Sequence, residues 1–157
     1  MSKDEPIFIS FQKDEDKYNA YIPIKEFLSS NEDIEPSLKK ATRLYSISIS
    51  RMVNLVKEIN KFRISHCPLP ARKIWELVDL IFKLVKGLNQ LSLQIDGLYE
   101  HLERDLKVKS KWLEKVIIFR RYIQDKNSIP QSLNWGKCEK GTRRKAELIQ
   151  KGLLNSI

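Results

Sequence analysis

Apolar side chains recur every seven residues through the middle of the chain, as they do where α-helices pack along one another. In residues 36–64 the first series is Leu38, Tyr45, Met52 and Ile59. A second series, three positions later, is Ala41, Ser48, Leu55 and Phe62. Two interleaved series of this kind predict a helix from about Pro36 to Ile64.

A stronger pattern of the same kind follows the proline-rich segment 66–70, which is expected to end the first helix. Its apolar positions are Ile74, Leu77, Ile81, Leu84, Leu88, Leu91, Ile95, Leu98 and Leu102. At roughly 1.5–3 kcal/mol per buried side chain, they outweigh the cost of about 1 kcal/mol for each of Gly87 and Gly97 in a helix. We therefore expect one helix from Pro70 or Ala71 to about Lys107, antiparallel to the first.

Two further helices are expected in the last third of the chain. A broad apolar face from Trp112 to Ile123 predicts a helix over Lys109–Lys126, ended by the segment before Pro130. Residues 130–141 have the character of a loop or short turns. A last short helix is predicted from Thr142 to Leu153, with Thr142 as its N-cap.

The first part of the chain is the least regular. Ile7, Ile9 and Phe11 alternate with other residues, and the acidic segment 14–16 separates them from Tyr18, Ala20 and Ile22. This pattern fits either a β-hairpin with an acidic turn or an extended arm lying on the helices. A short helix over residues 23–29 fits the sequence that follows.

These elements predict an all-α fold. It is a helical bundle built on a long antiparallel helical hairpin, with a third packed helix, a short C-terminal helix and the N-terminal hairpin or arm. The expected division is residues 1–34 for the arm or hairpin, 35–126 for the bundle and 127–157 for a basic C-terminal segment. The heptad positions can hold the bundle together within one chain or recruit a second copy.

Composition favours a single domain in the cytoplasm. The chain has 157 residues, of which 41% are hydrophobic and 31% charged. No apolar run approaches the roughly 18 residues of a membrane span, and the charged N-terminus does not resemble a signal peptide. Cys67 and Cys138 form no disulfide framework, so both thiols are expected to be reduced.

The positive charge of the chain is unevenly distributed. The formal net charge is +9, and residues 107–157 contain 13 Lys and Arg against 4 Asp and Glu. Residues 1–106 contain 16 of each kind. A neutral part followed by a cationic part suggests that the second part meets an anionic partner.

The densest cationic cluster lies at the start of the predicted last helix. Arg143, Arg144 and Lys145 fall in its first turn, where the helix dipole favours acids instead. A phosphate bound by the exposed N–H groups and these side chains would resolve the conflict. Trp135 would stack on a base, and Lys137 and Lys140 add charge nearby. The alternative is a solvated basic tail whose Trp135 packs on the bundle.

The third helix supplies a second candidate surface. Its basic residues would line a groove that follows a nucleic-acid backbone. They are Lys109, Lys111, Lys115, Arg120 and Arg121. The alternative is an ordinary solvated helix face.

The sequence offers no signature of an enzyme or a cofactor site. Gly136 and Gly141 have the spacing of a phosphate-binding loop, but Thr142 replaces the required lysine and no apolar strand precedes Gly136. The histidines and cysteines lack the spacing of a zinc site. Cys138 lies among cations that would lower its pKa, but the sequence provides no base to activate it.

The resulting hypothesis is a non-catalytic accessory subunit of a nucleoprotein complex, which grips the phosphates of DNA or RNA with its basic C-terminal third. The alternative is a protein-interaction adaptor or antitoxin-like partner that docks an acidic protein surface. In that case Ile7–Phe11 would add to the edge of a partner's sheet.

Overall fold

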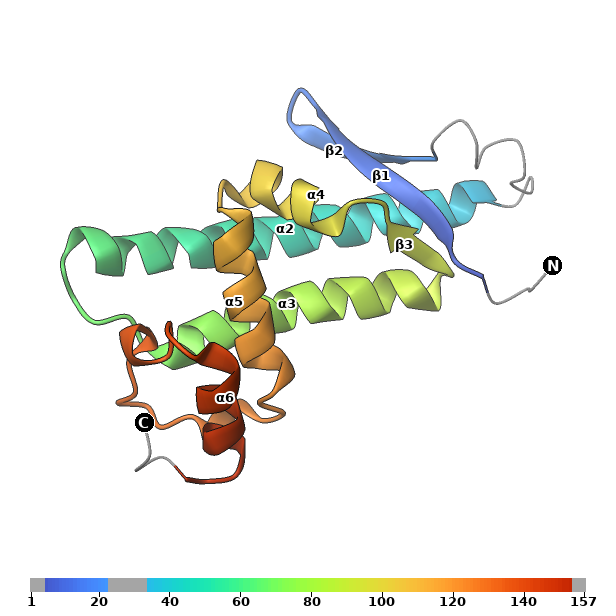
Figure 1. The fold of residues 1–157 in the computed structure, drawn as a ribbon. Helices are drawn as coiled ribbons and strands as arrows, with labels where there is room; N and C mark the ends of the chain where they lie inside the picture. Colours follow the sequence, from blue (N-terminus) through green and yellow to red (C-terminus); the bar gives the residue numbers. More distant parts are fainter. Residues whose placement is uncertain (1–4, 23–33, 154–157) are drawn as a thin grey trace.

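The computed structural model describes residues 5–22 and 34–153, of which 63% are helical and 13% lie in strands. These residues form a three-stranded sheet and five α-helices (Figure 1). The all-α prediction was therefore wrong, because the chain is mainly helical but carries a sheet. The helix expected over residues 23–29 lies outside the described residues.

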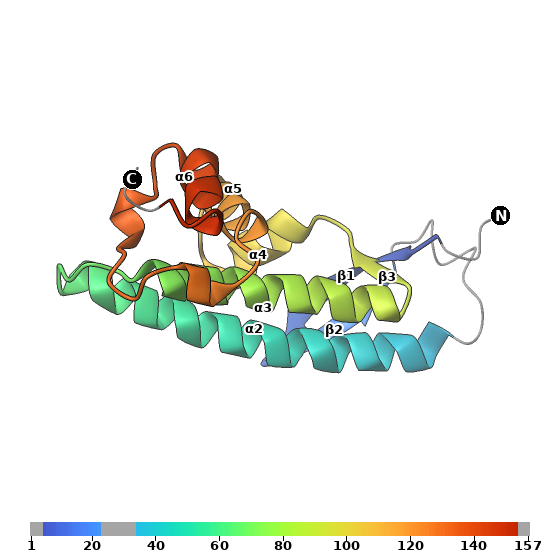
Figure 2. The same ribbon diagram turned by 90° about the horizontal axis from the view of Figure 1, so that it is seen from below.

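Two long helices form the predicted antiparallel hairpin. Helix α2 covers Ile34–Ile64 and helix α3 covers Ala71–Gln90, and both views show them side by side (Figures 1 and 2). A Cβ on Gly87 of α3 would lie 2.6 Å from Leu44 Cδ2 of α2. The absence of a side chain at Gly87 thus lets the two helices approach closely, which offsets its low helix propensity.

The second helix is shorter than the predicted Ala71–Lys107, because strand β3 (Leu93–Ile95) interrupts it before helix α4 (Leu98–Leu106). Ser92 after α3 has φ 60° and Gly97, the N-cap of α4, has φ 76°, and both lie in the left-handed region that a continuous right-handed helix does not contain. Leu93 is fully buried. The segment therefore keeps its apolar burial while leaving the helical path.

The sheet has the strand order β2-β1-β3, with β1 over Ile7–Asp14 and β2 over Lys17–Tyr21. Strands β1 and β2 form the hairpin alternative, and β3 pairs in parallel with Ile7–Ile9 on the other edge of β1. Ile9 and Phe11 are fully buried against the helices. Because β1 is the middle strand, the prediction that Ile7–Phe11 adds to the edge of a partner's sheet was wrong.

Helix α4 is joined to β1 by His101. The N–H of Phe11 donates to His101 Nε2 at 2.9 Å, and His101 Nδ1 lies 2.8 Å from the carbonyl oxygen of Gly97. Because the backbone N–H can only donate, Nε2 accepts and the proton is on Nδ1, which donates to Gly97. His101 is buried and acts as a structural residue that satisfies the β1 backbone.

The last third of the chain folds over one face of the α2–α3 pair (Figure 2). Helix α5 (Ser110–Arg121) crosses the pair, and helix α6 (Thr142–Gln150) packs beside α5 at the end away from the sheet (Figure 1). Two short 3₁₀ turns, η1 (Lys126–Ser128) and η2 (Trp135–Lys137), lie between them. Helix α5 ends before the predicted Lys126. The carbonyl oxygen of Ile123 accepts a hydrogen bond from Trp75 Nε1 of α3 at 2.9 Å, in place of the bond it would accept within a longer helix.

One hydrophobic cluster in the described residues joins the sheet to all five helices. The heptad residues of α3 are buried in this cluster, which leaves them unavailable for the self-association that the sequence suggested. They include Ile74, Leu77, Ile81, Leu84 and Leu88. Within residues 5–22 and 34–153, no helix has the length and apolar character needed to cross a membrane.

Candidate functional site

Three of the predicted cations lie at the start of α5 and along its solvent side. Lys109 is the N-cap, and Lys111 and Lys115 are four residues apart on the face opposite the buried Leu113 and Val116. All three lysines are exposed, and none has an ion-pair partner among the described residues. This part of the predicted surface is available to an anionic partner.

Arg120 is not part of that surface. Its Nη2 lies 3.0 Å from Asp79 Oδ1 on α3, and its guanidinium lies over the rings of Trp75 and Phe82 at 4.3 and 5.1 Å. The Arg120 side chain is 15% exposed. The prediction that Arg120 contacts phosphates is corrected, because its charge is used to hold α5 against α3.

Arg121 is exposed but faces a different direction from Lys111 and Lys115. It lines a shallow cavity of about 370 Å³ with Phe82 of α3 and Tyr99 of α4. The structure therefore does not bring Arg121 together with the two lysines.

Trp135 is also removed from the predicted surface. The residue is 2% exposed, and its ring meets Phe119 edge to face with the ring centroids 5.1 Å apart. Its faces are covered by protein, so the expectation that Trp135 stacks on a base is corrected. The alternative in which Trp135 packs on the bundle describes its position.

The start of α6 has the predicted cations but a different cap. The N-cap is Gly141, with φ 62°, and the Thr142 hydroxyl donates backward to the carbonyl of Cys138 at 2.8 Å. Thr142 therefore does not cap the helix, and among the residues that the structure describes no side-chain cap hydrogen bond is made to the start of α6. Arg143, Arg144 and Lys145 follow in the first turn, which contains no acid.

These three cations differ in the contacts that they make within the protein. Arg143 pairs with Glu147 at 3.1 Å, and its guanidinium lies 4.9 Å from the ring centroid of Tyr122 at the end of α5. Lys145 donates to the carbonyl of Lys137 at 2.6 Å. Arg144 is exposed and has no ion pair within the described residues.

Tyr122 connects the two helices of the candidate surface. It lies eleven residues after Lys111 and seven after Lys115, which places it on the same side of α5. Because Arg143 stacks on Tyr122, the first turn of α6 adjoins the end of α5 on this side. We call this region the α5–α6 surface, and its exposed cations without an ion pair in the described residues are Lys109, Lys111, Lys115, Lys137, Lys140 and Arg144.

Sequence reasoning missed the cations of α2. This helix contains only two acids, Glu35 and Glu58, against seven cations, Lys39, Lys40, Arg43, Arg51, Lys57, Lys61 and Arg63. Residues 1–33 are rich in Asp and Glu, so the two segments cancel when charge is summed over residues 1–106. Summing charge over each predicted element would have shown the excess.

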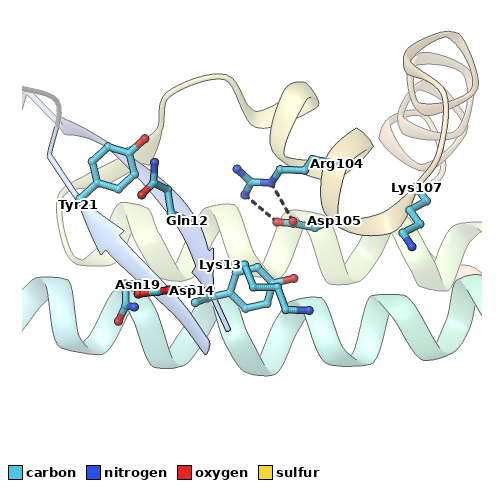
Figure 3. A pocket seen from close by; sticks show the side chains of 9 residues that line it. Gln12, Lys13, Asp14, Asn19, Tyr21, Arg104, Asp105 and Lys107 are labelled. Atoms are coloured by element: carbon cyan, nitrogen blue, oxygen red, sulfur yellow. Dashed lines mark hydrogen bonds and ion pairs between the residues drawn. The ribbon is translucent and has the colours of Figure 1, made fainter. Parts of the chain in front are cut away.

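A polar groove between the β1–β2 hairpin and α4 was also missed. It has a volume of about 790 Å³, and Figure 3 shows Tyr21 and Gln12 at one end, Lys107 at the other, and Arg104 and Asp105 between them. We call it the hairpin groove, and its lining residues are Gln12, Lys13, Asp14, Tyr18, Asn19, Tyr21, Arg104, Asp105 and Lys107. The groove joins residues that are far apart in the sequence, so no local pattern could reveal it.

The Asp105 carboxylate in the wall of the groove is held by an ion pair and a hydrogen bond. Its side chain is 5% exposed and accepts from Arg104 at 2.9 Å and from the Tyr45 hydroxyl. Burial, followed by the hydrogen bond to Asp105, raises the pKa of Tyr45 above its usual value, so the hydroxyl keeps its proton. The pair with Asp105 likewise raises the pKa of Arg104. Asp105 therefore acts as a buried link between α2 and α4.

Cys138 lacks the environment of a reactive thiol. It is buried, and desolvation raises its pKa to about 11 despite the nearby charge of Lys145. The lowered pKa suggested by its cationic neighbours is therefore corrected. In the part of the chain that the structure describes, no three His, Cys, Asp or Glu side chains are grouped as metal ligands would be.

No protein-family model, no curated protein and no solved structure matches this chain.

Proposed function

We propose that the protein is a non-catalytic accessory subunit of a nucleoprotein complex that binds the phosphate backbone of DNA or RNA through the α5–α6 surface. The observation that carries the proposal is the set of six exposed cations on this surface that have no ion pair among the described residues. Cys67 and Cys138 are both free thiols, and Cys67 is exposed. Free thiols are typical of the reducing cytoplasm, so they fit a cytoplasmic location.

The arrangement of charge favours a partner over solvent alone. Like charges repel, and the cations in the first turn of α6 add to the positive end of the helix dipole. The uncapped N–H groups of that turn point in the same direction as the dipole. Phosphate groups would satisfy both features, and the release of counterions from the nucleic acid would supply the driving force.

The same surface argues for binding without strong sequence preference. Flexible lysines on an exposed helix face contact phosphates, which position a protein but do not identify bases. Arg120 is held against α3 and Trp135 is buried, so neither side chain is available for base contacts. Contacts from this surface alone are thus expected to tolerate many sequences.

Salt dependence tests the proposal. The purified protein is titrated with labelled single- and double-stranded DNA and RNA between about 50 and 200 mM salt. We expect the logarithm of the binding constant to fall steeply and linearly with the logarithm of salt concentration. No binding at about 50 mM salt would overturn the proposal and favour the rival function, docking to an acidic protein.

A matched pair of triple variants locates the site. Lys111→Glu, Lys115→Glu and Arg144→Glu reverse three charges on the α5–α6 surface. Lys40→Glu, Arg51→Glu and Lys61→Glu make the same change on the exposed side of α2, opposite its buried residues. The first variant should bind at least tenfold more weakly and lower the salt slope by about 2–3, whereas the second should change both much less. Equal losses of affinity in the two variants would mean that binding depends on the overall charge of the molecule and not on the α5–α6 surface.

A further inference from the structure

We propose that the hairpin groove binds a single-stranded segment of nucleic acid, with bases on the outer face of the sheet and phosphates directed toward Lys107. This inference rests on the proposed function and names the form of nucleic acid that the protein prefers. It concerns a site separate from the α5–α6 surface.

The outer face of the sheet offers two aromatic rings to solvent. Alternation along β1 puts Phe8, Ser10 and Gln12 on the face opposite the buried Ile9 and Phe11. Tyr21 pairs with Ser10 across the hairpin, so it shares that face and is the diagonal neighbour of Phe8.

Both rings are accessible to a ligand. Phe8 is 42% exposed and Tyr21 is 40% exposed, and Tyr21 lines the groove directly (Figure 3). An exposed aromatic ring offers a flat apolar face on which a planar ligand can stack. Stacking of a base on such a ring is worth roughly 1–3 kcal/mol and tolerates any base.

Two side-chain amides lie beside the aromatic platform. Gln12 and Asn19 are directly opposite each other in the hairpin, and both line the groove. Each amide has a donor and an acceptor, which match the edges of an unpaired base. In a duplex the base faces are stacked and most edges are paired, so this combination selects single strands.

The charges of the groove give the strand a direction. Lys13 and Lys107 are exposed, whereas Arg104 is held by Asp105 and by the carbonyl of Phe11 at 2.8 Å. Asp14 also lines the groove and offsets the charge of its neighbour Lys13, which leaves Lys107 as the cation of the lining without an adjacent acid in the sequence. A bound backbone is therefore attracted toward Lys107.

Lys107 joins the groove to the proposed phosphate-binding surface. Besides the groove, it lines a second cavity of about 320 Å³ together with Arg63, Lys109 and Trp112. Lys109 begins α5, where Lys111 and Lys115 continue the line of cations. A strand leaving the groove at Lys107 thus passes Asp105, whose charge is paired with Arg104, and reaches the first cation of the α5–α6 surface.

The test compares single strands with duplexes. Wild type and the variant Phe8→Ala with Tyr21→Ala are titrated with oligo(dT) and with a blunt duplex of equal length. A length of about 20 nucleotides exceeds the roughly 4–16 nucleotides of typical single-strand sites. The variant should lose at least tenfold in affinity for the single strand and keep its affinity for the duplex. Both side chains are exposed, so the fold should be retained, which circular dichroism checks.

The control is Ile47→Ala, which removes an exposed apolar side chain (49% exposed) from α2. It should leave single-strand affinity unchanged. If the double variant binds the single strand as tightly as the wild type, or loses affinity equally for both nucleic acids, the single-strand site in the groove is overturned. The proposed function remains in that case. A wild type that binds neither nucleic acid overturns both. Photo-cross-linking of iodouracil-substituted single strands should label peptides containing residues 7–21, and labelling only of α5 or α6 contradicts the inference.

Discussion

Arg120 Nη2 on α5 lies 3.0 Å from Asp79 Oδ1 on α3, and the two side chains are 15% and 19% exposed. The ion pair is reinforced by the rings of Trp75 and Phe82, over which the guanidinium lies. This contact holds α5 against α3, beside the apolar core contacts of Leu113, Val116 and Phe119.

Replacing Arg120 should therefore weaken the fold. Arg120→Ala removes the ion pair and both cation–π contacts, and should lower the free energy of unfolding by about 2 kcal/mol, since partly covered charges lose more than surface ones. Urea denaturation followed by circular dichroism measures the change. The control is Arg121→Ala at the adjacent exposed position, which should stay within about 0.5 kcal/mol of the wild type. Equal effects at the two positions would contradict the structural role of Arg120.

Replacement of the two histidines should also change the stability of the protein to different extents. His101→Asn cannot reach the Phe11 N–H from α4, and a buried unpaired N–H costs about 1–3 kcal/mol. His66→Asn is a matched control, because His66 is exposed at φ 56°, a conformation that Asn tolerates. Thermal unfolding should separate the variants clearly, and a His101→Asn protein as stable as the wild type would refute the role of His101.

The two thiols should react at very different rates. Burial raises the pKa of Cys138 to about 11, so only about 0.1% is thiolate at pH 8, whereas Cys67 is exposed. A chromogenic disulfide reagent should therefore titrate one thiol quickly in the native protein and the second only in denaturant. In the variant Cys67→Ser the rapid phase should disappear. Two thiols of equal native reactivity would contradict the burial of Cys138.

Alkaline pH should remove the stabilisation provided by Tyr45. Its folded-state pKa is raised above the usual 10.0, so folding favours the protonated hydroxyl. That contribution is complete below pH 10 and is lost as pH rises above it. The difference in melting temperature between wild type and Tyr45→Phe should therefore shrink from pH 8 to about pH 11. The two proteins differ only at residue 45, so a constant difference would argue against the raised pKa.

The sequence predicted best those helices that are determined by residues close together in the chain. The heptad pattern and the prolines around Leu69 located α2 and the start of α3, because helix periodicity and proline restraints act within a few residues. Strand β3 could not be located in that way. Leu91 and Ile95 satisfy the heptad pattern and the alternation of a strand equally well, and the choice depends on pairing with Ile7–Ile9.

The candidate site was predicted in part. Lys109, Lys111, Lys115 and Arg144 are exposed as a cationic surface requires, although their function remains a prediction. Arg120 and Trp135 carry the same sequence signal but turn inward, because α3 supplies Asp79 and α5 supplies Phe119. Such choices depend on tertiary contacts, which composition and spacing do not encode.

Strand β1 lies between a neighbour that follows it at once and one that comes from residues 93–95. During synthesis one edge of β1 therefore stays unpaired until α2, α3 and then β3 have left the ribosome. Early contacts within the helical hairpin are short-range and fast, whereas closing the sheet requires a long loop. Mutations in β3 should consequently expose nascent chains to aggregation through that open edge, even where the finished protein remains stable.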